Sequence, residues 1–524
     1  MRRCVAGILR VSLPATDLLG SSPDPMTRQL YRYSWALVAF AAAAAADLNG
    51  NWVVRQDMHD GTFQNTYFHL RMEAGRITGS IRSTQAFYKI TDSTGAADAF
   101  TLTGTWPDGH NQRKAIYEGK LVGDELHIGT RRNNGPLSEM VAVRTAESEG
   151  ALPAPVAPPA LHKVPDNGLV RTPPMGWNCW NKFAGRVTAE DVRGMADTMA
   201  SNGMKDAGYV YINIDDTWEA GRDAQGNIQT NKKFPDMKAL AAYVHGKGLK
   251  LGIYSSPGPN TCAGYEGSYL HEEQDARTYA AWGIDYLKYD WCGARNLYSD
   301  EEMQAVYQKM GDALRGSGRP IVYSLCQYGR ADVWKWGPEV GGNLWRTTGD
   351  ISDSWASMSR IGFGQNDLAP YAGPGHFNDP DMLEIGNGGM TDDEYRTHMS
   401  LWSLLAAPLL AGNDLRTMTP AIAAILTNRE VIAIDQDPAG KQGHRASADG
   451  EREIWVRPLA DGSTAVALFN RSAAEALISV KWAELGLGGQ LHARDLWRHE
   501  DFPIGAEYAA NVRAHGVVLL RVRK

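Results

Sequence analysis

Apolar and polar residues alternate in short runs near both ends of the chain. Between residues 47 and 150 these runs include TYFHLRM, RITGSIRS and KAIYEGKL, and between 438 and 524 they include EIWVRPL and STAVALFN. Gly, Asp and Asn separate many of the runs. A period of two predicts strands that bury one face. We therefore expect an N-terminal all-β domain, either a small barrel or a sandwich, and a C-terminal antiparallel β-sandwich.

The central region, residues 168–437, repeats a different unit. Short apolar runs that end in polar residues, such as YVYINIDD and DYLKYDWC, alternate with amphipathic stretches such as AEDVRGMADTMASNGMKDAG. Repeated strand–helix units predict an α/β fold, here a (β/α)8 TIM barrel. A doubly wound open sheet is the alternative, but no G-x-G-x-x-G follows the first strand. Residues 151–167, rich in proline, are expected to form an extended linker.

Composition and charge narrow the classes of function. The chain has 43% hydrophobic and 22% charged residues and a net charge of -7, which is typical of globular proteins. It contains no run of Lys and Arg, so nucleic acid is not an expected partner. There is no H-E-x-x-H, no C-x-x-C pair and no P-loop, and the 13 His are scattered. The sequence therefore predicts neither a metal site nor a cofactor.

The first 46 residues resemble a targeting segment. The stretch Met26–Ala46 has two Arg, then an apolar run, then small residues suited to cleavage before Asp47. This predicts a signal peptide with Met26 as the start, and a secreted or periplasmic protein without a stable membrane span after cleavage. A membrane anchor is the alternative, although the apolar run is short for a span.

Five aspartates stand at the predicted strand ends of the central region. Active sites of (β/α)8 barrels are built at these ends, so the five carboxyl groups are expected at one mouth. Each alone could be a helix N-cap, but five close carboxylates repel each other and need cations or a polyhydroxylated ligand to offset them. Lys288 and Arg346 can supply positive charge. The five are Asp215, Asp216, Asp290, Asp350 and Asp381.

Two of these aspartates suit a glycosidase mechanism. Lys288 and Asp290 lie two residues apart on one strand, so both face the barrel axis. A neighbouring Lys keeps the Asp ionised, and an ionised carboxylate can attack an anomeric carbon. Asp350, on another strand, is the candidate that protonates the leaving oxygen. A buried structural salt bridge between Lys288 and Asp290 is the alternative interpretation.

Six motifs of the chain resemble those of glycoside hydrolase family twenty-seven, the α-galactosidase (melibiase) family, over about residues 168–524. The resemblance implies a retaining exo-glycosidase that hydrolyses terminal α-D-galactosides of oligosaccharides or glycans through a covalent glycosyl-enzyme. It implies that Asp290 is the nucleophile and Asp350 the acid/base. The motifs, in order, are TPPMGWNCWNKF, NIDDTW, GIYSSPG, LKYDWC, WRTTGDI and GHFNDPDML.

The resemblance also implies a set of contacts to the sugar. Gln327, where the family often carries Glu or Ser, is expected near the sugar 2-substituent. A disulfide is implied between Cys262 and Cys292, which would leave Cys179 and Cys326 as thiols. The other implied sugar contacts are Trp180, Asp215, Asp216, Tyr254, Lys288, Arg346 and Asp381.

Several alternatives remain at the level of sequence. The same scaffold could serve an α-N-acetylgalactosaminidase or a β-L-arabinopyranosidase. A non-catalytic carbohydrate-binding protein is a third possibility, against which the retention of both Asp290 and Asp350 argues. The N-terminal β-domain could bind glycan or pack against the barrel, and the oligomeric state is open.

Overall fold

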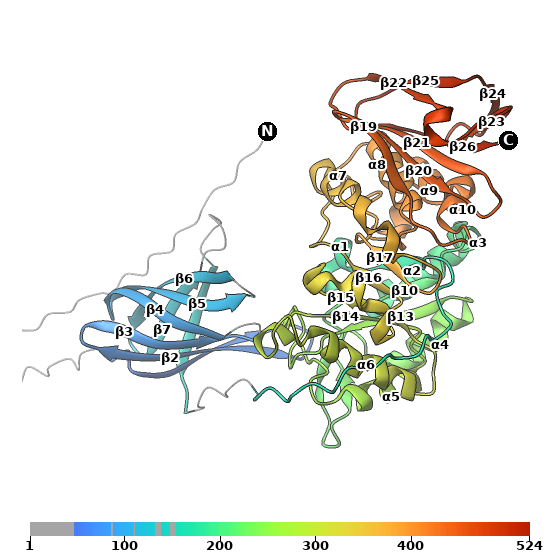
Figure 1. Cartoon of the computed structure of the whole chain (residues 1–524). Coiled ribbons are helices and arrows are strands. Elements are labelled where there is room, and N and C mark those ends of the chain that lie inside the picture. Colours follow the sequence, from blue (N-terminus) through green and yellow to red (C-terminus); the bar gives the residue numbers. More distant parts are fainter. Residues whose placement is uncertain (1–46, 85–86, 109–110, 131–137, 147–152) are drawn as a thin grey trace, which may run out of the picture. The chain divides into compact units, whose positions relative to one another are not determined.

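The computed structural model describes residues 47–524 apart from 85–86, 109–110, 131–137 and 147–152 (Figure 1). The predicted leader, residues 1–46, lies outside the described residues. Among the described helices, none combines the length and the apolar character needed to cross a bilayer.

Eight antiparallel strands form the N-terminal domain (Figure 1), and each pairs with the next along the chain. The first and last strands also pair, through Trp52 with Arg144, so the sheet closes into a barrel. Trp52, Phe68 and Leu102 are fully buried inside it. The pairing of the first and last strands decides between the barrel and the sandwich that the alternation allowed. The strands are β1 (Gly50–Asp57), β2 (Phe63–Glu73), β3 (Arg76–Arg82), β4 (Phe87–Ala96), β5 (Ala99–Asp108), β6 (Asn111–Val122), β7 (Glu125–Thr130) and β8 (Ser138–Arg144).

The central region contains the predicted barrel of parallel strands. Its sheet has the order β17-β16-β15-β14-β13-β10-β9-β18. β17 and β18 lie at the two edges of this sheet. The barrel is closed by an isolated parallel bridge between Leu383, which follows β17, and Ala411 on β18. The strands are β9 (Met175–Asn178), β10 (Tyr211–Asn213), β13 (Lys250–Ser255), β14 (Tyr286–Asp290), β15 (Val322–Cys326), β16 (Leu344–Arg346), β17 (Phe377–Asp379) and β18 (Leu409–Ala411), and a short hairpin of β11 (Glu219–Arg222) and β12 (Ile228–Thr230) follows β10.

Helices connect these strands and cover the barrel (Figure 1). The first long helix, Ala189–Ser201, shows why they form: Thr188 and Asp191 make a capping box, and Val192 and Met199 lie on its buried face. The helices are α1 (Trp180–Phe183), α2 (Ala189–Ser201), α3 (Met204–Ala207), α4 (Met237–Gly246), α5 (Glu272–Trp282), α6 (Met303–Gly316), α7 (Trp355–Phe363), α8 (Asp392–Leu404), α9 (Pro420–Leu426) and α10 (Arg429–Asp435).

The C-terminal region is antiparallel, as predicted. It consists of a six-stranded sheet with the order β19-β20-β21-β26-β23-β24 and a two-stranded sheet, β22-β25. Side chains such as Val466, Leu468 and Ile478 form the core between them. The strands are β19 (His444–Asp449), β20 (Arg452–Pro458), β21 (Thr464–Asn470), β22 (Ala476–Lys481), β23 (Leu491–Asp495), β24 (Glu500–Ile504), β25 (Glu507–Val512) and β26 (Val517–Arg523).

Candidate active site

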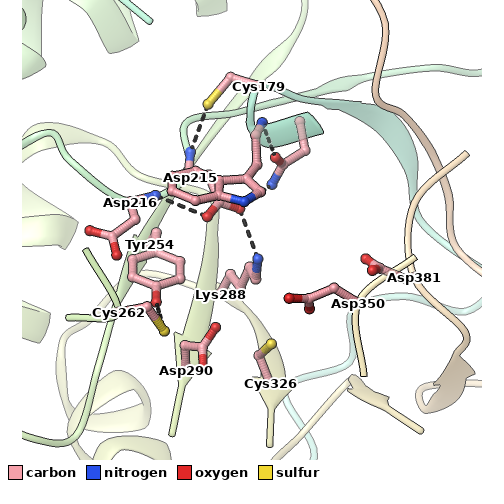
Figure 2. A network of polar contacts seen from close by, with 12 residues as sticks. Cys179, Asp215, Asp216, Tyr254, Cys262, Lys288, Asp290, Cys326, Asp350 and Asp381 are labelled. Atoms are coloured by element: carbon pink, nitrogen blue, oxygen red, sulfur yellow. Dashed lines mark hydrogen bonds and ion pairs between the residues drawn. The ribbon is translucent and has the colours of Figure 1, made fainter. Parts of the chain in front are cut away.

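A cavity of about 780 Å³ opens among the residues that end or follow the parallel strands. The barrel therefore brings the five predicted aspartates together, as the strand-end rule requires. Figure 2 shows several of them around one space. The predicted residues that line the cavity are Trp180, Asp215, Asp216, Tyr254, Lys288, Asp290, Arg346, Asp350 and Asp381.

Asp215 and Asp216 follow β10, and their carboxylates are almost fully buried. Asp215 accepts hydrogen bonds from Asn178 Nδ2 at 2.8 Å and from Lys288 Nζ at 2.9 Å. Asp216 accepts from the backbone N–H of Ala263 at 2.7 Å. Burial raises the pKa of Asp216 to about 7, although hydrogen bonds from Thr261, Ala263 and Thr217 oppose the rise. Asp216 therefore titrates near neutrality.

Lys288 pairs with Asp215 rather than with Asp290 (Figure 2). Both Lys288 and Asp290 lie on β14 as predicted, but the lysine reaches toward the carboxylate that follows β10. Burial lowers the pKa of Lys288, but the acidic groups around it, Asp215 first and Asp290 among the others, together more than offset this, so the pKa is raised overall. The ammonium group therefore stays charged, and its field still lowers the pKa of Asp290.

Asp290 ends β14 and is 4% exposed. Burial raises its pKa above the usual value, against the opposing effects of Lys288 and of a hydrogen bond from Tyr328. The Tyr328 hydroxyl donates to Asp290 Oδ1 at 2.7 Å. This bond fixes one oxygen of the carboxylate, and the thiol of Cys326 is a second side-chain donor to the same group. Asp290 is thus a held carboxylate that faces the cavity.

Arg346, at the end of β16, connects two further carboxylates. Its guanidinium is 3% exposed and lies 2.9 Å from Asp381 Oδ2 and 3.1 Å from Asp350 Oδ1. Asp381 also accepts from the backbone N–H of Ile351 at 2.8 Å. The side chain of Asp350 is 72% exposed, so it keeps access to solvent. A solvent-accessible carboxyl group beside a fixed cation suits proton exchange with water.

The predicted disulfide is present at the edge of the cavity. Cys262 and Cys292 are bonded, with their Cα atoms 5.0 Å apart. The Tyr254 hydroxyl donates to Cys262 Sγ at 2.9 Å, so the bridge also positions a predicted sugar contact. Cys179 and Cys326 are buried thiols, as expected from the pairing. The disulfide connects the loops that follow β13 and β14 and so stiffens two sides of the site.

Comparison with known proteins agrees with this geometry. The sequence model described as alpha galactosidase A matches residues 172–437, and the one described as the alpha galactosidase C-terminal beta sandwich domain matches residues 449–522. The α-galactosidase of Cyamopsis tetragonoloba is 48% identical over 357 residues, which cover 67% of this chain and 86% of that protein. This chain belongs to the α-galactosidase family.

Solved structures support the same membership. α-Galactosidase I from Mortierella vinacea matches with a TM-score of 0.66 and 34% identity, covering 69% of this chain and 99% of that chain. The α-galactosidase from Saccharomyces cerevisiae, solved with raffinose, matches with a TM-score of 0.63 and 29% identity over 68% of this chain and 98% of its own. The family models begin at residue 172, so they do not include the N-terminal barrel.

Within this α-galactosidase-family site, Gln327 and Tyr328 take different positions. Gln327 is fully buried, and neither polar atom of its side chain has a partner among the described residues. Tyr328 lines the cavity instead. Its backbone adopts a left-handed conformation with φ 64°, which is uncommon for a residue with a large side chain. This turn directs Tyr328 toward Asp290, a role that the sequence reasoning missed.

The cavity is also lined by polar residues that the sequence analysis did not select. Glu384 is one of them; it accepts from Asn181 and Asn387, and burial raises its pKa to about 7. Asp353 and Lys182 also line the cavity. Lys182 lies on α1 within the motif TPPMGWNCWNKF, but the motif alone does not mark it as a cavity residue. Glu384 and Asp353 lie on loops whose path the sequence pattern does not specify.

Proposed function

We propose that this glycoside hydrolase of the α-galactosidase family removes terminal α-D-galactose with retention of configuration, using Asp290 as nucleophile and Asp350 as general acid/base. The observation that carries the proposal is the pair of carboxyl groups in one cavity with different surroundings. Asp290 is buried and held by Tyr328, whereas Asp350 is exposed beside Arg346. Different surroundings suit the two carboxyl groups to different roles.

Double displacement then follows from general glycosidase chemistry. Asp290 attacks the anomeric carbon, the bond to the leaving oxygen breaks, and Asp350 gives that oxygen a proton. Asp350 next takes a proton from water, which attacks the same carbon and releases Asp290. We expect the two carboxyl groups to be separated by about 5–5.5 Å, as in retaining enzymes, rather than by about 6.5–9.5 Å, as in inverting ones.

The remaining cavity residues are proposed to bind the galactose. Trp180 offers an apolar surface to the sugar ring, and the carboxylates of Asp215, Asp216 and Asp381 can accept hydrogen bonds from sugar hydroxyls. Lys288 and Arg346 can donate to sugar oxygens. Buried charged groups give strong and directional hydrogen bonds. The relative solved with raffinose supports oligosaccharides that end in galactose as the substrate class.

Substrate preference tests this proposal. We expect kcat/KM for nitrophenyl α-galactoside to exceed that for nitrophenyl α-N-acetylgalactosaminide by about 10–100-fold, because Tyr328 lines the cavity and overpacking costs about 1–3 kcal/mol. Nitrophenyl β-L-arabinopyranoside should also be the slower substrate, since it lacks the hydroxymethyl group.

The three nitrophenyl glycosides are compared at equal enzyme concentration by release of nitrophenol. A preference for the N-acetylated or the arabinosyl substrate would overturn the galactose assignment. Release from none of the three would favour a carbohydrate-binding protein without activity.

Tyr328→Phe should shift the pH dependence of the reaction. The phenol donor lowers the pKa of Asp290, so its loss raises that pKa. The nucleophile reacts as the carboxylate, and the acidic limb of kcat/KM should therefore move to higher pH, by about one pH unit for a lost hydrogen bond to a charged group. The rate–pH profile with nitrophenyl α-galactoside measures this shift.

Tyr298→Phe provides the matched control. Its hydroxyl donates to the carbonyl of Val156, and Tyr298 does not line the cavity. The profile of this variant should coincide with that of the unmodified protein. An acidic limb that stays in place in Tyr328→Phe would show that the phenol does not govern the ionisation of the nucleophile.

We also infer that the protein is exported. The predicted leader with its cleavage point before Asp47 supports this, and so does the disulfide between Cys262 and Cys292. Disulfides of this kind persist in oxidising compartments and are rare in the cytosol. Secretion and the periplasm both satisfy these conditions.

A further inference from the structure

The turn between β1 and β2 carries a buried aspartate, Asp60, into contact with the catalytic barrel. Asp60 is 2% exposed. Its Oδ2 accepts from the Tyr265 hydroxyl at 2.7 Å and from Asn231 Nδ2 at 3.3 Å, and it lies 3.5 Å from Lys233 Nζ. The other oxygen, Oδ1, accepts from the backbone and hydroxyl of Thr62. A carboxylate can be buried only when donors and charges compensate it.

The electrostatics of Asp60 agree with a built contact. Burial alone raises the pKa of this carboxyl group, but donors from Thr62 and Tyr265 and the charge of Lys233 hold it below its usual value. The backbone adds a further bond, from the N–H of Lys232 to the carbonyl of Asp60 at 3.0 Å. Asp60 is therefore charged. It is held by Thr62 of its own turn and by Tyr265 and Lys232 of the catalytic barrel.

The partners of Asp60 also hold the segment next to Asp216. Asn231 Nδ2 donates to the carbonyl of Thr217 at 2.8 Å, and Lys233 Nζ donates to the Thr217 hydroxyl at 2.9 Å. Thr217 is the residue after Asp216, and its N–H donates to the Asp216 carboxylate at 2.7 Å. One chain of contacts thus runs from Asp60 to Asp216 through Thr217.

A second chain of contacts runs through the loop that carries Cys262. The side chain of Gln64, on β2, donates to the carbonyl of Ala263. The N–H of the same Ala263 donates to Asp216 Oδ2 at 2.7 Å. A Cβ atom at Gly264, where φ is 87°, would lie 2.4 Å from the hydroxyl of Thr84. The N-terminal barrel therefore packs directly against the loop that binds Asp216.

We propose that the β1–β2 hairpin of the N-terminal barrel positions the galactose site, because Asp60 and Gln64 fix the two segments that orient the Asp216 carboxylate. The proposal rests on the sugar-binding role that we propose for Asp216. It gives the N-terminal domain, which lies before the region matched by the family models, a part in substrate affinity. Asp60 and Gln64 do not line the cavity, so they act as positioning residues through Asp216.

Asp60→Ala should weaken galactose binding without a matching loss of kcat. Loss of one or two hydrogen bonds in the chain of contacts should raise KM for nitrophenyl α-galactoside by about 3–10-fold. The inhibition constant of free galactose should rise by the same factor, while kcat changes by less than about threefold, since Asp290 and Asp350 keep their partners. Asp60→Asn, which retains an oxygen acceptor for Tyr265, should be intermediate.

The matched control is Asp124→Ala, in the exposed turn between β6 and β7 of the same barrel. Its galactose inhibition constant should stay within about twofold of the unmodified value. Tyr265→Phe removes one hydroxyl and serves as a milder second variant. The losses of Asp60→Ala and Tyr265→Phe should not add when the two changes are combined, because they break the same contact.

Two results would overturn the proposal. The first is a galactose inhibition constant that is the same for Asp60→Ala as for Asp124→Ala. If Asp60→Ala does not fold, the same comparison is made with Tyr265→Phe. The other is a loss that appears in kcat while galactose affinity is unchanged. An unmodified protein that neither cleaves the galactoside nor binds galactose would instead refute the proposed function.

Discussion

Asp290→Gly is expected to lower kcat for nitrophenyl α-galactoside by about 10⁴–10⁶-fold, the scale on which loss of a covalent nucleophile acts in other enzymes. Without this carboxylate no glycosyl-enzyme can form. The substituted position would leave room for a small anion on the same side of the sugar. Added azide should then displace nitrophenolate directly and give β-galactosyl azide, the inverted product. Nuclear magnetic resonance of the isolated azide measures its configuration.

Asp300→Gly is the control for this substitution. Asp300 lies in the segment after β14, forms an ion pair with Arg330 and does not line the cavity. The same chemical change there should leave kcat within about twofold and make no azide product. Rescue of Asp290→Gly with retained configuration would mean that a different carboxylate is the nucleophile.

The positions of Asp290 and Lys288 could be predicted because strand geometry is regular. Successive side chains alternate across a strand, so residues two apart must share the inner face. The partner of Lys288 could not be predicted in the same way. Alternation specifies the direction of a side chain but not which carboxylate across the barrel it meets. Asp215 follows β10, and β13 lies between β10 and β14.

The backbone conformation at Tyr328 explains why its contact with Asp290 could not be predicted from the sequence. The pattern of β15 ends at Cys326, and a regular continuation would have directed the next side chains by alternation alone. The left-handed turn at Tyr328 breaks this regularity and brings its hydroxyl to Asp290. Thr217 and Asp381 also have positive φ, 84° and 91°. Such conformations are rare outside glycine, and they cluster at functional sites.

Contacts between distant residues of the N-terminal domain could not be predicted from the sequence either. Its strands follow from alternation, but a barrel and a sandwich have the same alternation, and only the pairing of β1 with β8 shows that the sheet closes into a barrel. The contact of Asp60 with Tyr265 joins residues 205 positions apart. No local pattern specifies such a pair, and a single aspartate in a turn is most simply interpreted as a surface turn residue.

Asp350→Ala is expected to have different effects on substrates with different leaving groups. Proton donation contributes about 10²–10⁴-fold, so cleavage of a galactose-terminated oligosaccharide should fall by that factor. Nitrophenolate needs little protonation to leave, and the first step with nitrophenyl α-galactoside should survive much better. The second step then lacks its base and becomes slow, so the covalent intermediate should accumulate. Mass spectrometry of the trapped protein measures that intermediate.

Azide should react with this intermediate and restore turnover, since it needs no proton removal. It attacks the face opposite Asp290 and should give α-galactosyl azide, with retained configuration. The cavity should survive the substitution because Arg346 keeps its ion pair with Asp381 at 2.9 Å. Asp353→Ala, which removes another carboxylate that lines the same cavity, should show no rescue by azide. The two azide products assign the two carboxyl groups independently. A retained product from Asp290→Gly together with an inverted one from Asp350→Ala would require the roles to be exchanged.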